Sequence, residues 1–479
     1  MTLALDAETR DSLWKIVVGT IESYLQTVEA SPVSRSPDVA RIRGFAESFN
    51  FAQPIAPEEA FRVIASELMH TQVHTPHPQY FGLFNPAPTS MSIAADALVA
   101  AVNPQLAAWS HSPLAAEMER HLVLSIAEKF GLPRDQADGV FASGGAEANQ
   151  TAVLAALTNR WPHVGSCGLR GLQEEPVFYV SLEGHHSFLK AARAAGLGAD
   201  ALREIEVTND LRMDLDALRC QISQDRAAGY TPFLVIATAG TTGAGVIDLL
   251  PDIAALAQEQ GLWFHVDAAW GGAAALVPEM RTLLAGIELA DSITFDPHKW
   301  LSVSMGAGMF LTRHTDILSR CFATQTAYMP KEGETMQVTD PFAHSLQWSR
   351  RFIGLKLFLS LVVAGWEGYS AAIRHQTEMG ELLRSRLVKE NWKIVNRTLL
   401  PLVCFTDAGG TWDSADCQRI ANAVVSSGHA WISTIQLGRG KQPALRACIT
   451  NYRTGPPHID ALLEVLDQVR RGHKHPGCS

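Results

Sequence analysis

The sequence predicts an α/β protein with a mostly parallel central sheet and flanking helices, preceded by a helical N-terminal segment and followed by a small α+β domain. Between about residues 90 and 355, short apolar runs alternate with helical patterns such as residues 249–260. Strands that are apolar on both faces are typical of a sheet that helices cover on both sides. Ligands of such sheets bind at the carboxyl ends of the strands.

The predicted elements follow from the spacing of apolar residues. The strand candidates of the large sheet are residues 177–180, 233–237, 262–266 and 292–295. Helices are expected before them at about residues 7–30 and 57–70, where apolar side chains recur every three or four positions. Residues 31–60, rich in Ser, Pro and Arg, are expected to form a connection, and the proline-rich residues 75–89 an irregular packed loop.

The last part of the sequence is predicted to form a smaller unit. A long helix is expected from about residue 352 to 391, followed by the strand candidates 402–405 and 445–449 and by a last helix near residues 458–471. We therefore expect three units, namely an N-terminal helical segment (1–89), a large domain (90–356) and a small α+β domain (357–479).

The composition limits the kinds of partner that we expect. The 479 residues carry a net charge of -10, with 47% hydrophobic and 18% charged residues, as in an ordinary globular protein. An acidic chain without a basic stripe argues against nucleic acid and against anionic membrane surfaces. Seven scattered cysteines without a C-x-x-C pair predict neither a disulfide framework nor a metal site, and fit a cytoplasmic location. No apolar run is long enough to span a membrane.

Two predicted strands lead to residues that can carry chemistry. Residues 262–266 end at Asp267, and residues 292–295 lead to Lys299. A buried carboxylate is costly unless it meets a cation, and a lysine in an apolar site attacks carbonyl groups. Pyridoxal phosphate requires both, an amine for its aldehyde and a carboxylate for its ring nitrogen. Taken alone, Lys299 could be an ordinary surface lysine. Asp267 could be the N-cap of a helix.

Three other segments follow short apolar runs and add to this hypothesis. The glycine-rich residues 143–149 precede a helix, where backbone N–H groups can bind a phosphate, although a simple turn is the alternative. The imidazole of His185 can stack on an aromatic ring or belong to an ordinary loop. The hydroxyl of Thr242 can bond a ring oxygen or cap a turn.

Residues 240–242, 265–270 and 296–300 together resemble the group II pyridoxal-dependent amino-acid decarboxylases, with the pattern closest to that of the aromatic-L-amino-acid decarboxylases. The resemblance extends from about residue 77 to 446. It implies the fold type I architecture, pyridoxal 5'-phosphate as cofactor, and a homodimer with the active site at the subunit interface. The N-terminal segment would then pack on the partner subunit.

The resemblance implies roles around the cofactor ring. Lys299 would hold the cofactor as a Schiff base, and Asp267 would pair with the protonated ring nitrogen. His185 would stack on one face of the ring and Ala269 would pack on the other. Thr242 would approach the ring edge.

The resemblance also implies a phosphate site and a proton donor. Gly145, Ala146 and His298 would lie at or near the phosphate. Tyr328 matches the tyrosine of the family's mobile loop, and its hydroxyl would protonate the carbanion that remains after carbon dioxide leaves. Asp296 occupies a position that is asparagine in some relatives, and its role stays open because a carboxylate beside a phosphate is unfavourable.

The segment 79–85 and Trp109 match the region that forms the substrate wall in relatives. Leu83 and Phe84 are apolar where glutamate decarboxylases carry more polar residues, which favours an aromatic or large apolar substrate. The alternative is that these residues belong to the core. Leu83, a tyrosine in the animal aromatic enzymes, leaves phenylalanine, tyrosine, tryptophan and dopa as candidates.

Arg351 and Arg446 match family positions, and Arg446 lies near the place where relatives bind a substrate carboxylate, a task that suits a guanidinium. A structural salt bridge is the alternative for both. The expected reaction is decarboxylation of an aromatic L-amino acid to its amine. An aldehyde synthase and a decarboxylase of acidic amino acids are the alternatives, and Tyr328 favours the decarboxylase over the synthase. A non-enzymatic cofactor-binding scaffold is disfavoured because Lys299, Asp267 and Tyr328 are all present.

Overall fold

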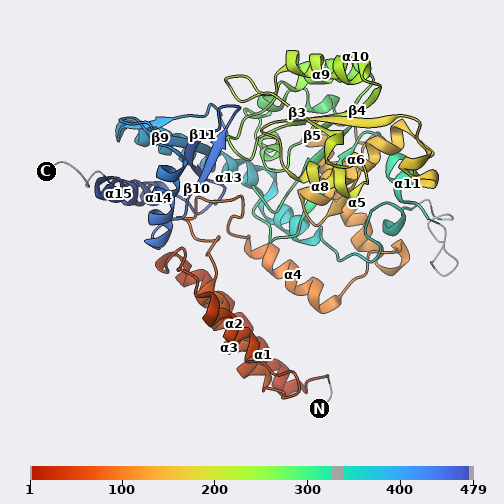
Figure 1. The fold of residues 1–479 in the computed structure, drawn as a ribbon. Helices are drawn as coiled ribbons and strands as arrows, with labels where there is room; N and C mark the ends of the chain where they lie inside the picture. The colour runs from red at the N-terminus through yellow and green to blue at the C-terminus, as the bar shows by residue number, and fades with distance from the viewer. Residues whose placement is uncertain (1–2, 325–328, 330–335, 337, 474–479) are drawn as a thin grey trace.

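The computed structural model describes residues 3–324, 329, 336 and 338–473 (Figure 1). The predicted catalytic residue Tyr328 lies outside the described residues. A helical arm, a large α/β unit and a smaller unit with its own sheet follow one another along the chain (Figure 1).

The large unit is built on a seven-stranded sheet in the order β1-β7-β6-β5-β4-β2-β3. Its strands are β1 (Asp138–Ala142), β2 (Glu175–Ser181), β3 (Leu202–Ile205), β4 (Tyr230–Thr238), β5 (Trp263–Asp267), β6 (Ser292–Phe295) and β7 (Gly308–Thr312). Only β7 runs antiparallel to its neighbours, β1 and β6. The other pairings are parallel, which confirms the predicted mostly parallel sheet.

Helices cover both faces of this sheet. The helices of the large unit are α4 (Ser90–Val102), α5 (Pro113–Lys129), α6 (Gly145–Arg160), α7 (Val164–Cys167), α8 (Ser187–Ala194), α9 (Leu215–Ala227), α10 (Leu250–Gln260) and α11 (Ile317–Phe322). Along β2, Tyr179 packs into the core under α5, α9 and α10, whereas Phe178 packs into the core under α6 and α8. Because successive strand side chains point to opposite faces, a strand buried on both sides must be apolar throughout.

The smaller unit contains an antiparallel sheet in the order β10-β11-β9-β8. Its strands are β8 (Trp392–Ile394), β9 (Leu402–Asp407), β10 (Ser433–Leu437) and β11 (Gln442–Cys448), and its helices are α13 (Leu355–Lys389), α14 (Ser414–Ser426) and α15 (Pro456–His473). The expected long helix is α13, which is kinked at Gly365, where φ is 62°. The expected strands and the last helix of this unit are confirmed.

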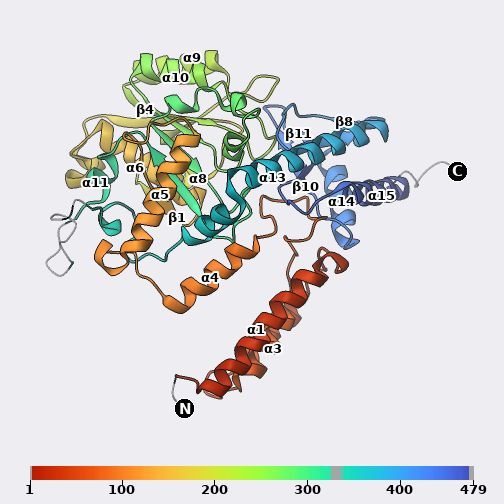
Figure 2. The same cartoon turned by 180° about the vertical axis from the view of Figure 1, so that it is seen from behind.

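The N-terminal helices form an arm that extends away from the rest of the chain (Figures 1 and 2). They are α1 (Ala7–Thr27), α2 (Val39–Glu47) and α3 (Pro57–Thr71), and none of them has a fully buried residue. The expectation of a plain connection over residues 31–60 was wrong because α2 lies within it. Asp38 caps α2 by accepting a hydrogen bond from the backbone N–H of Arg41.

The proline-rich segment that leads from the arm to α4 has neither helix nor strand, as predicted, yet Tyr80, Phe81 and Phe84 within it are buried. None of the described helices has the length and apolar character needed to cross a bilayer.

Candidate active site

The predicted cofactor residues gather at one edge of the large sheet. Asp267 is the last residue of β5, Lys299 follows β6, and His185 follows β2. These three strands are linked by parallel pairings, so their carboxyl ends lie at the same edge. Strand β1 points the same way as β6 because β7 is antiparallel to both, and this brings the Gly145 end of α6 to that edge.

Asp267 is buried and its two oxygens are both bonded. Its Oδ2 accepts a hydrogen bond from Asn149 Nδ2 at 2.9 Å, and its Oδ1 accepts one from the backbone N–H of Ala269 at 3.1 Å. The second N–H of Asn149 donates to Ser187 Oγ, also at 2.9 Å. Ser187 Oγ lies 2.8 Å from His185 Nδ1, so a chain of hydrogen bonds joins Asp267 to His185.

His185 is held as a neutral imidazole. Burial lowers its pKa, the charge of Asp267 opposes this shift, and the charge of Lys299 adds to it. Its Nδ1 also accepts from the backbone N–H of Ser187 at 3.2 Å, which assigns the ring proton to Nε2. Asn149 and Ser187 were not predicted as site residues. The only sequence signal for them is their place at the ends of the two segments that contain Gly145 and His185.

A second buried histidine, His265, contacts the same network at Asn149. His265 Nδ1 lies 2.8 Å from Ser292 Oγ, and its Nε2 lies 3.4 Å from Asn149 Oδ1. Burial lowers the pKa of His265 to about 4, so the ring is neutral near pH 7. Asn149 is therefore held at its oxygen as well as at both N–H groups.

Lys299 forms an ion pair with a second buried carboxylate. Its Nζ lies 3.0 Å from Asp296 Oδ2. His298 Nε2 is 3.9 Å from the same oxygen, and His298 Nδ1 lies 2.7 Å from the carbonyl oxygen of Ala307. The Asp296 carboxylate touches the turn before α6, because a Cβ built on Gly145 would lie 2.7 Å from Asp296 Oδ2.

Aromatic rings line the side of Lys299 that faces the small unit. Phe84 stacks on Trp270 with 4.6 Å between ring centroids, and Trp270 lies 5.4 Å from Trp300. Lys299 Nζ is 5.9 Å from the Phe84 ring centroid. The guanidinium of Arg446 lies 5.0 Å from the same centroid, on the β11 side. The predicted substrate residues Phe84 and Arg446 are thus brought beside Lys299.

Arg446 is buried and held mainly by backbone carbonyls. Its Nε donates to the carbonyl oxygen of Thr242 at 3.0 Å and its Nη1 to that of Gly82 at 2.8 Å. Its Nη2 has no hydrogen-bond partner among the residues that the structure describes. Neighbouring Leu83 is 51% exposed. The Nη2 of Arg446 and the side chain of Leu83 are therefore available to contact a bound ligand.

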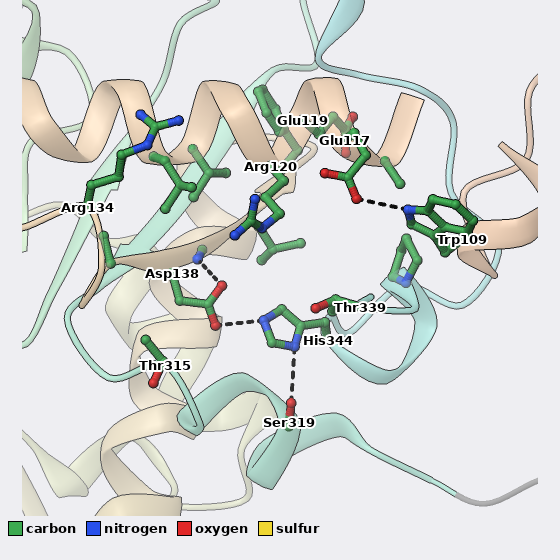
Figure 3. Close-up of a pocket in the computed structure, with 18 of the residues that line it drawn as sticks. Trp109, Glu117, Glu119, Arg120, Arg134, Asp138, Thr315, Ser319, Thr339 and His344 are labelled. Atoms are coloured by element: carbon green, nitrogen blue, oxygen red, sulfur yellow. Dashed lines mark hydrogen bonds and ion pairs between the residues drawn. The ribbon is translucent and has the colours of Figure 1, made fainter. Parts of the chain in front are cut away.

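Two predicted substrate residues lie elsewhere within the chain. Arg351 is largely exposed and binds Asp96, with 3.3 Å from its Nη2 to Oδ1. Trp109 donates its Nε1–H to Glu117 at 2.9 Å and lines a separate cavity of about 350 Å³ (Figure 3). Their roles at the substrate stay predictions. Ala146, expected near the phosphate, is exposed in the first turn of α6.

The cavity in Figure 3 contains a second polar cluster. His344 Nε2 lies 2.7 Å from Asp138 Oδ2, and its Nδ1 lies 3.2 Å from Ser319 Oγ. Asp138 begins β1 and Ser319 belongs to α11, so His344 links these two elements.

Comparison with known proteins places these residues in a family. The conserved domain of pyridoxal-dependent decarboxylases matches residues 46–407. The chain is 30% identical to an aromatic-L-amino-acid decarboxylase of Bacillus atrophaeus over 476 residues, which cover 98% of this chain and 96% of that protein. It is 31% identical to the cysteine sulfinic acid decarboxylase of Mus musculus over 405 residues, which cover 80% of this chain and 81% of that protein.

The fold agrees with the sequence comparisons. The crystal structure of Oryza sativa TDC with PLP and tryptamine superposes with a TM-score of 0.92 at 25% identity, covering 99% of this chain and 100% of that one. The match spans both sheets, and the fold type I prediction is confirmed. The chain belongs to the pyridoxal-dependent decarboxylase family.

Proposed function

We propose that this enzyme decarboxylates an L-amino acid with an aromatic side chain, such as phenylalanine, tyrosine, tryptophan or dopa, to the amine and carbon dioxide. Family membership makes the chain a pyridoxal-phosphate-dependent amino-acid carboxy-lyase. The observation that supports the aromatic substrate is the apolar surface beside Lys299, where Phe84 stacks on Trp270. An acidic side chain placed there would lose its water without gaining a cation, except for Arg446, which we assign to the α-carboxylate.

The residues at the sheet edge fit the cofactor. Asp267 is a buried carboxylate held in position by two hydrogen bonds, and the glycine turn before the 16-residue helix α6 has no side-chain cap to compete with an anion. We propose that the cofactor contacts are Lys299 at the aldehyde, Asp267 at the ring nitrogen, His185 and Ala269 at the ring faces, Thr242 at the ring edge, and Gly145, Ala146 and His298 at the phosphate. When bound, the cofactor supplies an electron sink for the electron pair that carbon dioxide leaves behind.

The protein's own residues would control charge and water during the reaction. Asp267 would face the ring nitrogen, and Asn149 holds that carboxylate in place by donating a hydrogen bond to it. Neutral His185 would pack on the ring without adding a positive charge. The free Nη2 of Arg446 binds the substrate carboxylate, while Phe84 excludes water from the reacting carbon. Tyr328 then delivers a proton to Cα.

A substrate screen tests this proposal. Both aromatic and acidic amino-acid decarboxylases are about equally similar to this chain, so the comparisons alone leave the side chain open. We expect amine from at least one of phenylalanine, tyrosine, tryptophan and dopa, detected by chromatography together with released carbon dioxide. Turnover of glutamate or cysteine sulfinate without turnover of any aromatic substrate would contradict the proposal. Lys299→Ala should lose the absorbance of the bound cofactor.

We also propose a homodimer with the active site at the subunit interface and three units, 1–89, 90–356 and 357–479. Exposed apolar side chains on the arm, such as Trp14 and Leu68, support the packing of the N-terminal unit on a partner subunit. An interface site would also account for Trp109 and Arg351 lying apart from Lys299 within one chain. The six described cysteines are unpaired, which supports a reducing compartment such as the cytoplasm.

A further inference from the structure

The segment just before the proposed substrate residues is attached to the small unit by its backbone. The N–H of Phe81 donates to the carbonyl oxygen of Trp431 at 2.8 Å, and the N–H of Trp431 donates to that of Gln79 at 3.2 Å. The N–H of Cys448, at the end of β11, donates to the carbonyl oxygen of Phe81 at 2.9 Å. Phe81 is fully buried in the hydrophobic core of the small unit. Residues 79–81 are therefore held by the small unit, although they precede the large unit in sequence.

Gly82 connects this segment to the substrate wall, by which we mean Leu83 and Phe84. Phe84 belongs to the hydrophobic core of the large unit, so the chain passes from the core of one unit to the core of the other between Phe81 and Phe84. The carbonyl oxygen of Gly82 accepts the hydrogen bond from Arg446 Nη1 at 2.8 Å. Gly82 therefore links the substrate wall to the guanidinium that we assign to the substrate carboxylate.

The indole ring of Trp431 packs directly on Gly82. A Cβ built on Gly82 would clash with Cε3 and Cζ3 of the indole ring and would lie 2.7 Å from Cζ of Tyr80. Close packing therefore requires a glycine at this position. The Tyr80 ring lies against the indole with 5.3 Å between centroids, and its hydroxyl oxygen accepts a hydrogen bond from the backbone N–H of Leu83 at 3.0 Å. Two aromatic rings thus hold the backbone that leads into the substrate wall.

We propose that Trp431 is a positioning residue for the substrate, because its indole ring fixes Gly82 and thereby fixes both the substrate wall and the guanidinium of Arg446. The distance between these two recognition points determines which aromatic side chain fits once the α-carboxylate is bound. The inference deepens the proposed function and rests on it, since it assigns the side chain of the substrate to Phe84 and the carboxylate to Arg446.

The position of Trp431 allows its role to be separated from folding. Trp431 lies just before β10 and is only partly buried, so its replacement removes less core contact than replacement of a fully buried tryptophan. Trp412 offers a matched control in the same unit. It is also partly buried, but it packs on Trp392, with 5.5 Å between ring centroids, in the core of the small unit.

The ratio of kcat/KM for tryptophan to kcat/KM for phenylalanine measures the proposed role. Trp431→Ala frees the substrate wall to move, so the larger substrate should gain relative to the smaller one, and the ratio should rise about tenfold. A loss of folded enzyme lowers both values equally and leaves the ratio unchanged. Trp412→Ala and the conservative variant Trp431→Phe should keep the wild-type ratio. A ratio that Trp431→Ala leaves unchanged would overturn the inference.

Exchanging the sizes of the two contacting residues gives an independent test. Gly82→Ala places a methyl group against the indole ring, so we expect kcat/KM to fall at least about tenfold. Adding Trp431→Ala removes the indole and gives the Tyr80 ring room to move, so the double variant should recover part of this loss. Gly82→Ala combined with Trp412→Ala should show no recovery. Full activity of Gly82→Ala, or losses that simply multiply when Trp431→Ala is added, would contradict the inference.

These experiments also separate the inference from the proposed function. Conversion of aromatic amino acids with an unchanged ratio and no recovery would reject only the role of Trp431. An enzyme that converts only acidic amino acids would reject the aromatic substrate. The size exchange would then be measured with the acidic substrate, because the α-carboxylate assigned to Arg446 is common to all amino acids, and recovery would still support Trp431 as a positioning residue.

Discussion

Asn149 Nδ2 donates a hydrogen bond to Asp267 Oδ2 at 2.9 Å, although 118 residues separate the two in sequence. The same amide group donates to Ser187 Oγ, which is bonded to His185. One side chain on α6 thus connects the carboxylate proposed for the ring nitrogen with the imidazole proposed for the ring face. Its position fixes both groups relative to each other before any cofactor binds.

Replacing this amide should weaken cofactor binding. Asn149→Ala removes a hydrogen bond to a charged group, which typically contributes about 1.5–3 kcal/mol, so we expect the affinity for pyridoxal phosphate to fall at least about tenfold. Absorbance titration measures this affinity. Gln150→Ala, one position further along α6, is the control. Equal affinities of the two variants would show that Asn149 does not position Asp267.

The strands that position the site could be predicted because of their burial. Strands β2, β4 and β5 are apolar on both faces, and the polar residues that end them stand out. Strands β1, β3 and β7 of the large sheet were missed because β3 includes Arg203 and Glu204 and because β1 and β7 each include a glycine, and these residue types are uncommon in strands. Helix α2 was missed because composition was given more weight than its cap, Asp38, and the apolar positions that follow it.

The contacts between side chains could not be predicted in the same way. Asp267 and Lys299 were identified because each lies at or just after a strand end. The roles of Asn149 and Ser187 depend on the distance between α6, β5 and α8, which no local pattern contains. The contact of the Asp296 carboxylate with the turn at Gly145 likewise depends on the packing of α6 against the loop after β6.

Burial of His265 should make stability depend on pH. Its folded pKa of about 4 lies below the ordinary value of 6.5, so between these values the unfolded chain binds a proton that the folded chain does not. Stability from this group is complete above about pH 6.5 and decreases as the pH falls, by at most about 3 kcal/mol at pH 4. Urea unfolding of wild type and His265→Gln at pH 7 and near pH 5 measures this loss. The variant should lose less stability, and parallel losses would contradict the assignment.

Replacing Arg446 should lower the affinity for the substrate. A lysine cannot hold the carbonyl oxygens of Thr242 and Gly82 and also present a further nitrogen to the substrate carboxylate, so Arg446→Lys should raise KM about tenfold or more. Arg439→Lys, at a largely exposed position before β11, is the control. Because Arg446 also bonds the carbonyls of Thr242 and Gly82, thermal unfolding must be measured beside the kinetics. Lower stability with unchanged KM would assign Arg446 a purely structural role.

Replacing Tyr328 should change the ratio of amine to aldehyde that the enzyme forms. Loss of a general acid typically slows a reaction by about 10²–10⁴-fold, so Tyr328→Phe should form amine much more slowly. The unprotonated carbanion then has time to react with oxygen, and the share of aldehyde and peroxide should rise. Chromatography of amine and aldehyde, with a peroxide assay, measures both outcomes. Amine production at the wild-type rate would exclude Tyr328 as the donor, and aldehyde as the main wild-type product would identify an aldehyde synthase.

The arm should be needed for assembly. Ile64 and Leu68 lie on α3 and are 49% and 58% exposed. Apolar surface of this kind is typical of an interface. Replacing both residues by glutamate would place charges in the proposed contact and should convert dimers to monomers in sedimentation velocity, with loss of activity. Arg62→Glu, on the same helix and already polar, is the control. If the double variant stays dimeric and active, the arm does not form the subunit interface.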